Sequence, residues 1–425
     1  MKRFYQSLMT WLKQSLSPMV AKFTQNTYVM AVQSAFQMVL PMILVGAVAN
    51  LLATFRNFLP WLPDVSAINQ YSFGLLGLFL AFVIPFNVLE LKGLGRARMV
   101  AGLTGISTMF ALMGPKIDKN GVMSFAAGNL GAGGMTVGLI AGLLLGWLFS
   151  AYFKRGLFPK DTTLPTIVVT WFESILPVIL VIAAAVVTTS LGVDVFGSMT
   201  RLFEPLQAIG NSFVGFVLLY FLMALFYSLG LSAWTAYPIF LALALPNIAA
   251  NADLVAAGQK PIYITTVEVV FAGWCTFGGM GGTMPLNLQM LRSKSARIRS
   301  VGRVAIFPSI FNINEPVMYG LPVVWNPLMM IPYLIVSLIV PSLTYLTLSG
   351  GLVAIPSRPF AMNFLPQPVS TFLTNYDWLG VVFWAVLFVI AYFVYLPFFK
   401  TYEAQEAAKE KAAAEAEDAA EAVAA

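Results

Sequence analysis

Apolar residues run along most of the chain in blocks, and short polar or glycine-rich stretches separate these blocks. A bilayer core about 30 Å thick needs about 20 apolar residues per helix. The blocks that meet or approach this length predict membrane-spanning helices at residues 28–53, 72–91, 99–113, 135–153, 167–191, 211–231, 262–291, 327–348 and 378–398. The pattern therefore predicts an all-α polytopic membrane protein with these nine candidate spans.

Two further apolar segments, residues 304–322 and 354–373, are interrupted by proline, asparagine and glycine. Irregular backbone at membrane depth is tolerated only where it is buried in protein or lines a wet cavity. These segments therefore predict two re-entrant hairpins, although the sequence leaves open whether the second one spans the membrane instead.

Two stretches carry apolar residues on one helical face only. Residues 192–210 predict an amphipathic helix lying along the membrane surface. Near the N-terminus, the apolar residues at helical spacing are Phe4, Leu8, Trp11, Leu12 and Leu16. This spacing predicts a helix in the membrane interface and does not resemble a cleaved signal peptide.

Five parts follow from these patterns. They are an interfacial helix at 1–27, an N-terminal transmembrane half at 28–191, a surface helix at 192–210, a C-terminal transmembrane half at 211–400 and a cytoplasmic low-complexity tail at 401–425. The tail is rich in alanine and glutamate, which predicts a solvated, partly helical segment.

Composition agrees with a membrane protein, because only 10% of the 425 residues are charged, whereas soluble domains carry about 25%. The net charge of +6 comes from short basic clusters beside the apolar blocks, and the densest cluster lies between Arg292 and Arg303. Lysine and arginine mark the cytoplasmic ends of membrane spans. The charge therefore indicates topology, and no nucleic-acid partner is expected.

The chain contains no histidine, which excludes histidine-based metal sites, Ser-His-Asp catalysis and a phosphohistidine on this chain. Cys275 is the single cysteine and lies in an apolar stretch, so we expect a buried, inert thiol and no disulfide within the chain. We expect neither a cofactor nor a metal.

Glu315 stands out because it lies in the broken segment "FNINEPVMYG". A carboxylate at membrane depth costs about 2.5 kcal/mol or more, so it persists where it meets a cavity, a partner charge or a ligand. With Asn312 and Asn314 beside it, the segment predicts a polar pocket that binds a neutral, hydroxyl-rich solute. The alternative is a structural ion pair, for instance with Arg303. Glu268 is a second candidate carboxylate, with no supporting pattern around it.

Two glycine runs, at residues 131–134 and 278–282, superficially suggest phosphate-binding loops. Neither run is followed by the Gly-Lys-Ser/Thr sequence that such a loop needs. Close helix packing or an unwound turn is the better interpretation of both runs.

The segment "FPSIFNINEPVMYGLPVVWNPLMMIPYLI" resembles the signature of membrane-embedded IIC subunits of the bacterial phosphoenolpyruvate-dependent sugar phosphotransferase system, of the lactose, cellobiose and diacetylchitobiose type. "LPTIVVTWFESILP" resembles that family's fifth helix, "FEPLQAIGNSFVGFVLLYFLMALFYSLG" its surface helix and the next span, and "LPFFKTY" its closing motif. The resemblance covers about residues 18–402.

The resemblance implies a homodimer of ten-helix protomers in the bacterial inner (cytoplasmic) membrane. The N-terminal half would make most of the dimer contact, and the C-terminal half would enclose a disaccharide, which we expect to be β-linked. Glu315 would bind sugar hydroxyls near the reacting carbon, and Asn312 and Asn314 would shape the pocket. A separate IIB protein, supplied through IIA, would pass a phosphoryl group from its phosphocysteine to the sugar. That residue is not Cys275, which is expected inside the membrane.

One position departs from the family pattern. Where the family reads Gly-Ile-His-Gly, this chain reads "GLSA", so Ser232 takes the place of a histidine that assists deprotonation of the sugar hydroxyl. Losing a general base typically costs a factor of about 10² to 10⁴ in rate. Phosphoryl transfer also depends on positioning and charge stabilisation, so slow phosphorylation, use of another carboxylate such as Glu268, and loss of the reaction all remain open.

These patterns leave three functions open. The first is a permease coupled to sugar phosphorylation by IIB, whose docking the basic loop at Arg292–Arg303 would suit. The second is a non-phosphorylating sugar facilitator or sensor, which the absent histidine favours. The third, an ion-coupled symporter, would need more intramembrane acids than the chain shows.

Overall fold

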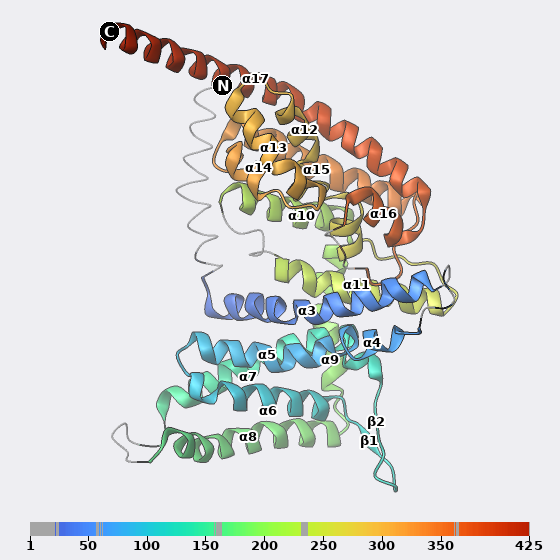
Figure 1. Cartoon of the computed structure of the whole chain (residues 1–425). Coiled ribbons are helices and arrows are strands. Elements are labelled where there is room, and N and C mark those ends of the chain that lie inside the picture. Colours follow the sequence, from blue (N-terminus) through green and yellow to red (C-terminus); the bar gives the residue numbers. More distant parts are fainter. Residues whose placement is uncertain are drawn as a thin grey trace. The chain divides into compact units, whose positions relative to one another are not determined.

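The computed structural model describes Lys22 and residues 25–56, 59, 61, 63–156, 158, 164–230, 237–360, 362 and 365–424. Nearly all of the predicted interfacial helix lies outside these residues. The described chain is almost entirely helical (Figure 1). It forms two compact units, residues 1–208 with 237–249 and residues 209–236 with 250–425.

The first unit contains α3 (Thr27–Phe55), α4 (Ser66–Gln70), η2 (Phe73–Leu75), α5 (Leu76–Leu91), η3 (Gly95–Ala97), α6 (Arg98–Leu112), η4 (Ala127–Asn129), η5 (Ala132–Gly134), α7 (Met135–Arg155), α8 (Thr166–Ser190) and most of α9 (Val195–Asn211). In the loop after α6, strands β1 (Lys116–Ile117) and β2 (Met123–Ser124) form a short antiparallel pair.

The second unit contains α10 (Phe213–Ser228), the π-helix η7 (Glu268–Trp274), α12 (Met284–Leu291), α13 (Ala296–Ile310), α14 (Glu315–Gly320), α15 (Pro327–Ser349), α16 (Gln367–Asn375) and α17 (Trp378–Ala424). Helix α11 (Tyr237–Ala256) contributes residues to both units.

Six described helices are long and apolar enough to cross a membrane, or seven if the bent pair α9 and α10 forms one span. The six are Ala67–Leu91, Met135–Arg155, Thr166–Ser190, Ile239–Ala256, Pro327–Ser349 and Trp378–Glu415. The predicted all-α membrane fold is therefore confirmed. The total of about ten crossings also includes shorter helices such as α6, and that number stays a prediction.

Two elements differ from the sequence-based expectation. The pattern does not predict α11, because proline, asparagine and aspartate at Pro246, Asn251 and Asp253 interrupt its apolar run. The continuous span predicted at 262–291 is wrong. It is broken into η7, a turn and α12, because the glycines of the turn adopt positive φ angles that no right-handed helix contains.

In the first unit, α5 packs against α3, α6 and α7. Small residues allow these close contacts. A Cβ atom on Gly105 of α6 would lie 1.9 Å from the carbonyl oxygen of Ala81, and one on Gly138 of α7 would lie 2.4 Å from that of Gly77. Helices in membranes associate through such small-residue contacts. The glycine run at 131–134 belongs to the same packing, since a Cβ on Gly131 would collide with the backbone of Gly74.

Helix α8 is joined to η3, directly before α6, by an ion pair between Arg96 and Glu173, with 2.8 Å between nitrogen and oxygen. Glu173 is almost completely buried, whereas the side chain of Arg96 keeps about a third of its exposure. The opposite face of α8 is apolar and exposed, with Trp171, Phe172, Ile175, Leu176, Ile179 and Leu180. Lipid or a second protein chain is expected to cover this face.

Helix α9 is amphipathic, as predicted. Phe196 and Met199 pack against a buried cluster of the first unit that includes Leu112 and Val137. Asp194 and Arg201 are exposed and form an ion pair with each other.

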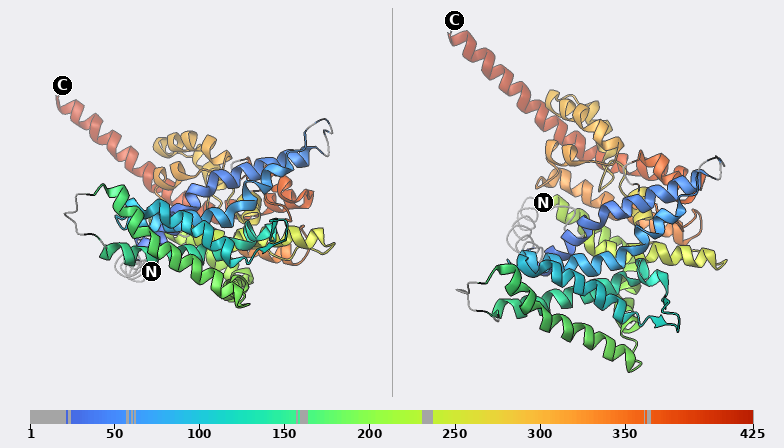
Figure 2. Two further views of the ribbon diagram at one scale, coloured as in Figure 1. Left: turned by 90° about the horizontal axis from the view of Figure 1, so that it is seen from below. Right: turned by 60° about the horizontal axis from the view of Figure 1, so that its bottom comes forward.

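In the second unit, α15 packs against α10 and α17, and α12 packs against both α13 and α17. Helix α17 continues without interruption well past its apolar part, and its C-terminal end projects as a free-standing helix (Figure 2). Its 47 residues correspond to about 70 Å at about 1.5 Å per residue, far more than a bilayer core requires. The residues from Lys400 onward therefore extend beyond the membrane.

Candidate functional site

The segment that carries Glu315 is a broken helix. Helix α13 ends at Ile310, and α14 begins at Glu315 after a short turn. Asn312 in that turn has φ +62°, a left-handed conformation that asparagine adopts more easily than most residues. Pro316, in the first turn of α14, has no N–H and is well suited to a helix start. The predicted interruption of this segment is thus observed.

Both asparagines of the motif hold the turn against other parts of the chain. The side-chain oxygen of Asn312 accepts a hydrogen bond of 3.0 Å from the N–H of Gly278, and its amide donates one of 3.1 Å to the carbonyl of Leu365. The amide of the buried Asn314 donates one of 2.8 Å to the carbonyl of Met280. These groups therefore fix the backbone around Glu315. Direct contact between either amide and a sugar stays a prediction.

The partner segment is the glycine run 278–282, and the structure shows an unwound turn there. Gly278, Gly279, Gly281 and Gly282 all have positive φ angles. A Cβ on Gly279 would lie 2.4 Å from the Cγ of Asn314, and one on Gly281 would lie 2.1 Å from the ring of Tyr333. Glycine is required here both by the backbone conformation and by these close approaches.

Two buried tyrosines form hydrogen bonds with the backbone of the glycine turn and of the residues just before it. The hydroxyl of Tyr220 donates to the carbonyl of Cys275 and accepts a 2.9 Å hydrogen bond from the N–H of Gly281. The hydroxyl of Tyr395 donates a 2.7 Å hydrogen bond to the carbonyl of Gly281. The sequence patterns singled out neither tyrosine. The available signal was a hydroxyl in an apolar span, which must find a partner when it is buried.

The carboxylate of Glu315 is exposed, and it forms no ion pair or hydrogen bond with any residue that the structure describes. The alternative in which Arg303 neutralises Glu315 is therefore wrong for the described chain. The nearby phenol of Tyr227, which is mostly buried, interacts electrostatically with this carboxylate. Glu315 is thus a charge on a rigid turn, available to a ligand.

Glu268 occupies a different position. It is the first residue of η7, and its carboxylate accepts a 2.8 Å hydrogen bond from the N–H of Phe360. Glu268 is 1% exposed. It joins the π-helix to the irregular stretch before α16, whereas Glu315 lies on the turn that contacts Gly278 and Met280. The structure does not bring the two carboxylates together through shared contacts.

Helix α16 holds the broken helix η7 in place. The carbonyls of Ala272 and Gly273 accept hydrogen bonds from Gln367, Ser370 and Thr371 on α16. Irregular backbone at membrane depth needs such partners for its polar groups. The predicted irregular segment 354–373 thus consists of an extended stretch followed by α16, and it supports the broken helix. In the described part of the chain, no group of three or more Asp, Glu, Cys or His side chains is placed to hold a metal ion.

The glycine turn and the Glu315 turn lie at opposite ends of the α12–α13 hairpin in the sequence, yet they meet in space. Residues 33–337 of the chain match the model of the family described as Phosphotransferase system, EIIC. The chain belongs to this family. The Glu315 turn, the glycine turn and the helices between them all lie within the matched residues.

Similar proteins include EIIC components from several bacteria. The putative permease IIC component YwbA of Bacillus subtilis (strain 168) is 26% identical, with 94% of this chain and 96% of that protein aligned. The lichenan permease IIC component of the same organism is 24% identical over 94% of both chains. The lactose-specific EIICB component of Lacticaseibacillus casei is 26% identical over 93% of this chain and 71% of that protein.

A solved structure shares the fold. It is the crystal structure of the transporter ChbC, the IIC component from the N,N'-diacetylchitobiose-specific phosphotransferase system. The TM-score is 0.84 at 24% identity, and the match covers 94% of this chain and 99% of that chain. The recognition from sequence of a IIC subunit of the lactose, cellobiose and diacetylchitobiose type is confirmed, and so is a multi-pass location in the bacterial membrane.

This EIIC chain is the sugar permease component of a phosphotransferase system, which works with IIB and IIA partners. Ser232, the residue in place of the family histidine, lies outside the described residues. The structure describes the chain just before it. There the N–H of Trp325 donates a 3.1 Å hydrogen bond to the carbonyl of Ser228, at the end of α10. Trp325, whose φ angle is +57°, follows α14, the helix that begins at Glu315. The hydrogen bond therefore joins the end of α10, shortly before Ser232, to the segment that carries Glu315.

Proposed function

We propose that this EIIC chain binds a β-linked disaccharide through Glu315 and moves it across the membrane while a separate IIB protein phosphorylates it. The observation that carries this proposal is the exposed carboxylate of Glu315, which is fixed by its neighbours' hydrogen bonds and carries no ion pair among the described residues. A carboxylate accepts hydrogen bonds from two adjacent hydroxyls, and adjacent hydroxyls are what a sugar ring offers.

The relatives support the proposed sugar class. They are named for lichenan, lactose and oligo-β-mannosides. This range supports a β-linked disaccharide and leaves the individual sugar open.

A homodimer is part of the proposal. The exposed apolar face of α8 is continuous over several turns, from Ile167 to Val187. A second copy of the chain is our proposed cover for this face, as the family resemblance implies for the N-terminal half.

The Glu315→Gln variant tests the pocket. We expect it to weaken the binding of lactose and cellobiose to the purified protein by about tenfold or more, because hydrogen bonds to a charged group contribute about 1.5–3 kcal/mol. Glu415→Gln, an exposed glutamate on the tail of α17, is the control. Unchanged affinity in Glu315→Gln would contradict the proposed role of this carboxylate.

The absence of a histidine at Ser232 favours a second candidate, a facilitator or sensor that binds the same sugar without phosphorylating it. Vesicles that contain the chain, with IIA, IIB and an energy donor added, distinguish the two candidates. Sugar phosphate inside the vesicles supports group translocation. If only free sugar accumulates inside the vesicles, at a rate that does not depend on IIB, the second candidate is supported.

A further inference from the structure

The two turns of the site are the two base ends of one helical hairpin. The glycine turn leads directly into α12, and α13 leads directly into the turn of Asn312. The tip of this hairpin, residues 292–295, belongs to the basic loop. The site and the basic loop are thus parts of one short structural unit.

Helices α12 and α13 are packed closely against each other. A Cβ on Gly302 of α13 would lie 2.8 Å from the Cβ of Met290 on α12. Nearer the base, the amide of Asn287 donates a 2.9 Å hydrogen bond to the hydroxyl of Ser309. Because protein interiors are close-packed and transmit strain, a displacement at the tip is carried to the base.

Helix α17 packs against α12 and is hydrogen-bonded to the hairpin at both ends. At the base, Tyr395 donates to the carbonyl of Gly281. In the last turn of α12, the amide of Gln289 donates a 2.8 Å hydrogen bond to the carbonyl of Tyr392. At the tip, the carboxylate of Glu403 accepts one of 2.7 Å from the N–H of Lys294.

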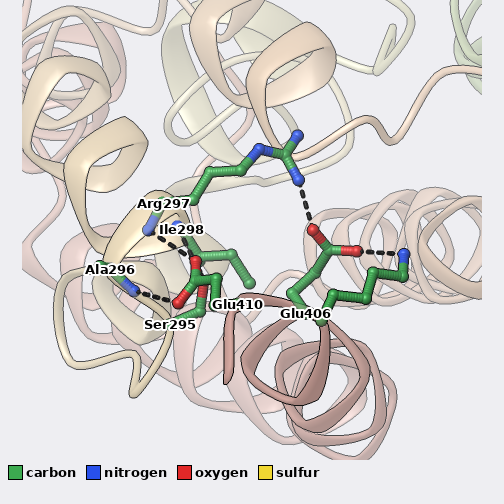
Figure 3. Close-up of polar contacts among 7 residues, drawn as sticks. Ser295, Ala296, Arg297, Ile298, Glu406 and Glu410 are labelled. Atoms are coloured by element: carbon green, nitrogen blue, oxygen red, sulfur yellow. Dashed lines mark hydrogen bonds and ion pairs between the residues drawn. The ribbon is translucent and has the colours of Figure 1, made fainter. Parts of the chain in front are cut away.

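The tip is held most firmly by Glu410, which lies well beyond the apolar part of α17. Its carboxylate accepts hydrogen bonds from the hydroxyl of Ser295 at 2.6 Å, the N–H of Ala296 at 2.9 Å and the N–H of Arg297 at 3.0 Å (Figure 3). The first N–H groups of a helix have no partner within the helix, and a negative charge at that end is stabilised by the helix dipole. Glu410 supplies both the hydrogen-bond acceptor and the negative charge at the N-terminus of α13.

Glu406 adds an ion pair at the same tip (Figure 3). Its carboxylate lies 2.5 Å from a guanidinium nitrogen of Arg297 and 2.6 Å from the ammonium of Lys409. Glu403, Glu406 and Glu410 recur every three to four residues and therefore lie on one face of α17. Glu403 and Glu406 are buried, so this part of the tail differs from the solvated segment that its composition predicts.

We propose that these three carboxylates, here called the tail clasp, are positioning residues for the sugar site. By fixing the tip of the α12–α13 hairpin to α17, the tail clasp holds the glycine turn and the Glu315 turn in the register that binds sugar. The effect on sugar affinity rests on the proposed function, whereas the mechanical coupling between tip and base does not.

Hydrogen–deuterium exchange of the full chain in lipid nanodiscs tests the coupling directly. The variant is the double substitution Glu406→Gln and Glu410→Gln, and the control is Glu415→Gln on the same helix. We expect faster exchange at residues 293–298, where the carboxylates bind, and also at 278–282 and 312–320, which they do not touch. Faster exchange confined to 293–298 would overturn the proposal, whether or not the protein binds a sugar.

Binding of lactose and cellobiose to the same preparations tests the consequence. We expect affinity to fall about fivefold or more in the double variant, the lower range of coupling between distant sites, and to stay unchanged in Glu415→Gln. A wild-type chain that binds no sugar contradicts the proposed function alone. A wild-type chain that binds sugar as tightly as the double variant contradicts the positioning role alone.

A double-mutant cycle separates positioning from a general loss of folding. Arg297→Gln and Glu406→Gln each break the same ion pair. We expect the double substitution to weaken sugar affinity by less than the sum of the two single losses, because residues in one interaction couple while independent effects add. Fully additive losses would show that the two residues do not act through their contact.

Discussion

The side-chain amide of Asn314 donates a hydrogen bond of 2.8 Å to the carbonyl oxygen of Met280, 34 residues earlier in the chain. Asn314 directly precedes Glu315, the candidate sugar-binding carboxylate, and Met280 lies in the glycine turn. The bond therefore sets the distance between the two irregular segments of the site. It also gives the "NINEP" segment a structural role, in addition to the binding role proposed for Glu315.

Asn314→Ala tests this relationship. The substitution leaves the carbonyl of Met280 without its side-chain donor in a buried place, which costs about 1–3 kcal/mol. We expect a lower thermal unfolding midpoint in detergent and weaker sugar binding. Asn120→Ala, in the exposed loop between β1 and β2, is the control and should change neither. An equal effect of the two substitutions would show that the bond is unimportant.

Gly281→Ala tests the need for glycine in the turn. Both Gly281 and Gly258 have positive φ, so alanine costs each about 1–2 kcal/mol in backbone strain. At Gly281 the new Cβ also meets the buried ring of Tyr333, whereas at Gly258 nothing lies within 4 Å. Overpacking adds about 1–3 kcal/mol. We expect Gly281→Ala to lower the unfolding midpoint clearly more than Gly258→Ala, and equal midpoints would refute the close contact.

Arg96→Ala tests the ion pair that joins α8 to η3 within the first unit. The buried carboxylate of Glu173 would lose its cation. Breaking a buried pair costs about 3–5 kcal/mol, and we expect about 2–3 kcal/mol because Arg96 is partly exposed. Arg98→Ala breaks the exposed pair with Glu90, which is worth about 0–1 kcal/mol. Thermal unfolding in nanodiscs should rank Arg96→Ala as the more destabilised variant.

Ser232→His tests whether the missing histidine limits phosphorylation. A positioned general base typically contributes a factor of about 10² to 10⁴. If group translocation is retained, we expect faster formation of sugar phosphate in vesicles with IIA and IIB, with sugar binding little changed. Ser232→Asn, which supplies a side chain of intermediate size and no base, is the control. A histidine variant no faster than the asparagine variant would contradict the assignment of Ser232 to the histidine position.

Lowering the pH should weaken the hydrogen bonds and ion pairs of the tail clasp. The hydrogen bond from Lys409, with that from Arg297, holds the pKa of Glu406 below its ordinary value. The hydrogen bond from Ser295, with those from the N–H groups of Arg297 and Ala296, lowers the pKa of Glu410. The pKa of Glu403, which also faces the loop, is lowered as well: burial opposes this shift, and the hydrogen bonds from Lys400 and Lys294 outweigh it.

A carboxyl whose pKa is lower in the folded state stabilises the fold at pH values above its unfolded pKa of about 4.3. This contribution is lost as the pH falls through the folded value. Lys400, Lys409 and Arg297 keep their charge throughout. We therefore expect the unfolding midpoints of the wild-type chain and of the Glu406→Gln, Glu410→Gln double variant to differ at pH 7 and to converge below about pH 4. If the difference between the two unfolding midpoints is the same at both pH values, the proposed contacts of the tail clasp are contradicted.

Local patterns were sufficient for the class of protein and for most of its helices. The length of the apolar blocks predicted the spans that became α7, α8 and α15, because crossing a bilayer imposes a minimum length on a helix. Proline and asparagine predicted the break before Glu315, because they stop a helix whatever surrounds them. The prediction failed at residues 262–291, where apolar composition concealed a turn made by glycines with positive φ.

The sequence by itself thus determined that this is a helical membrane permease with a carboxylate in a broken helix, because chain length, apolarity and proline act locally. Only the tertiary structure decided what holds that carboxylate in place. The partners of Asn312, Asn314 and Gly281 lie between 34 and 114 residues away along the chain, and the bond from Ser295 to Glu410 spans 115. Such contacts depend on how helices pack against one another, and no periodicity along the chain encodes that arrangement.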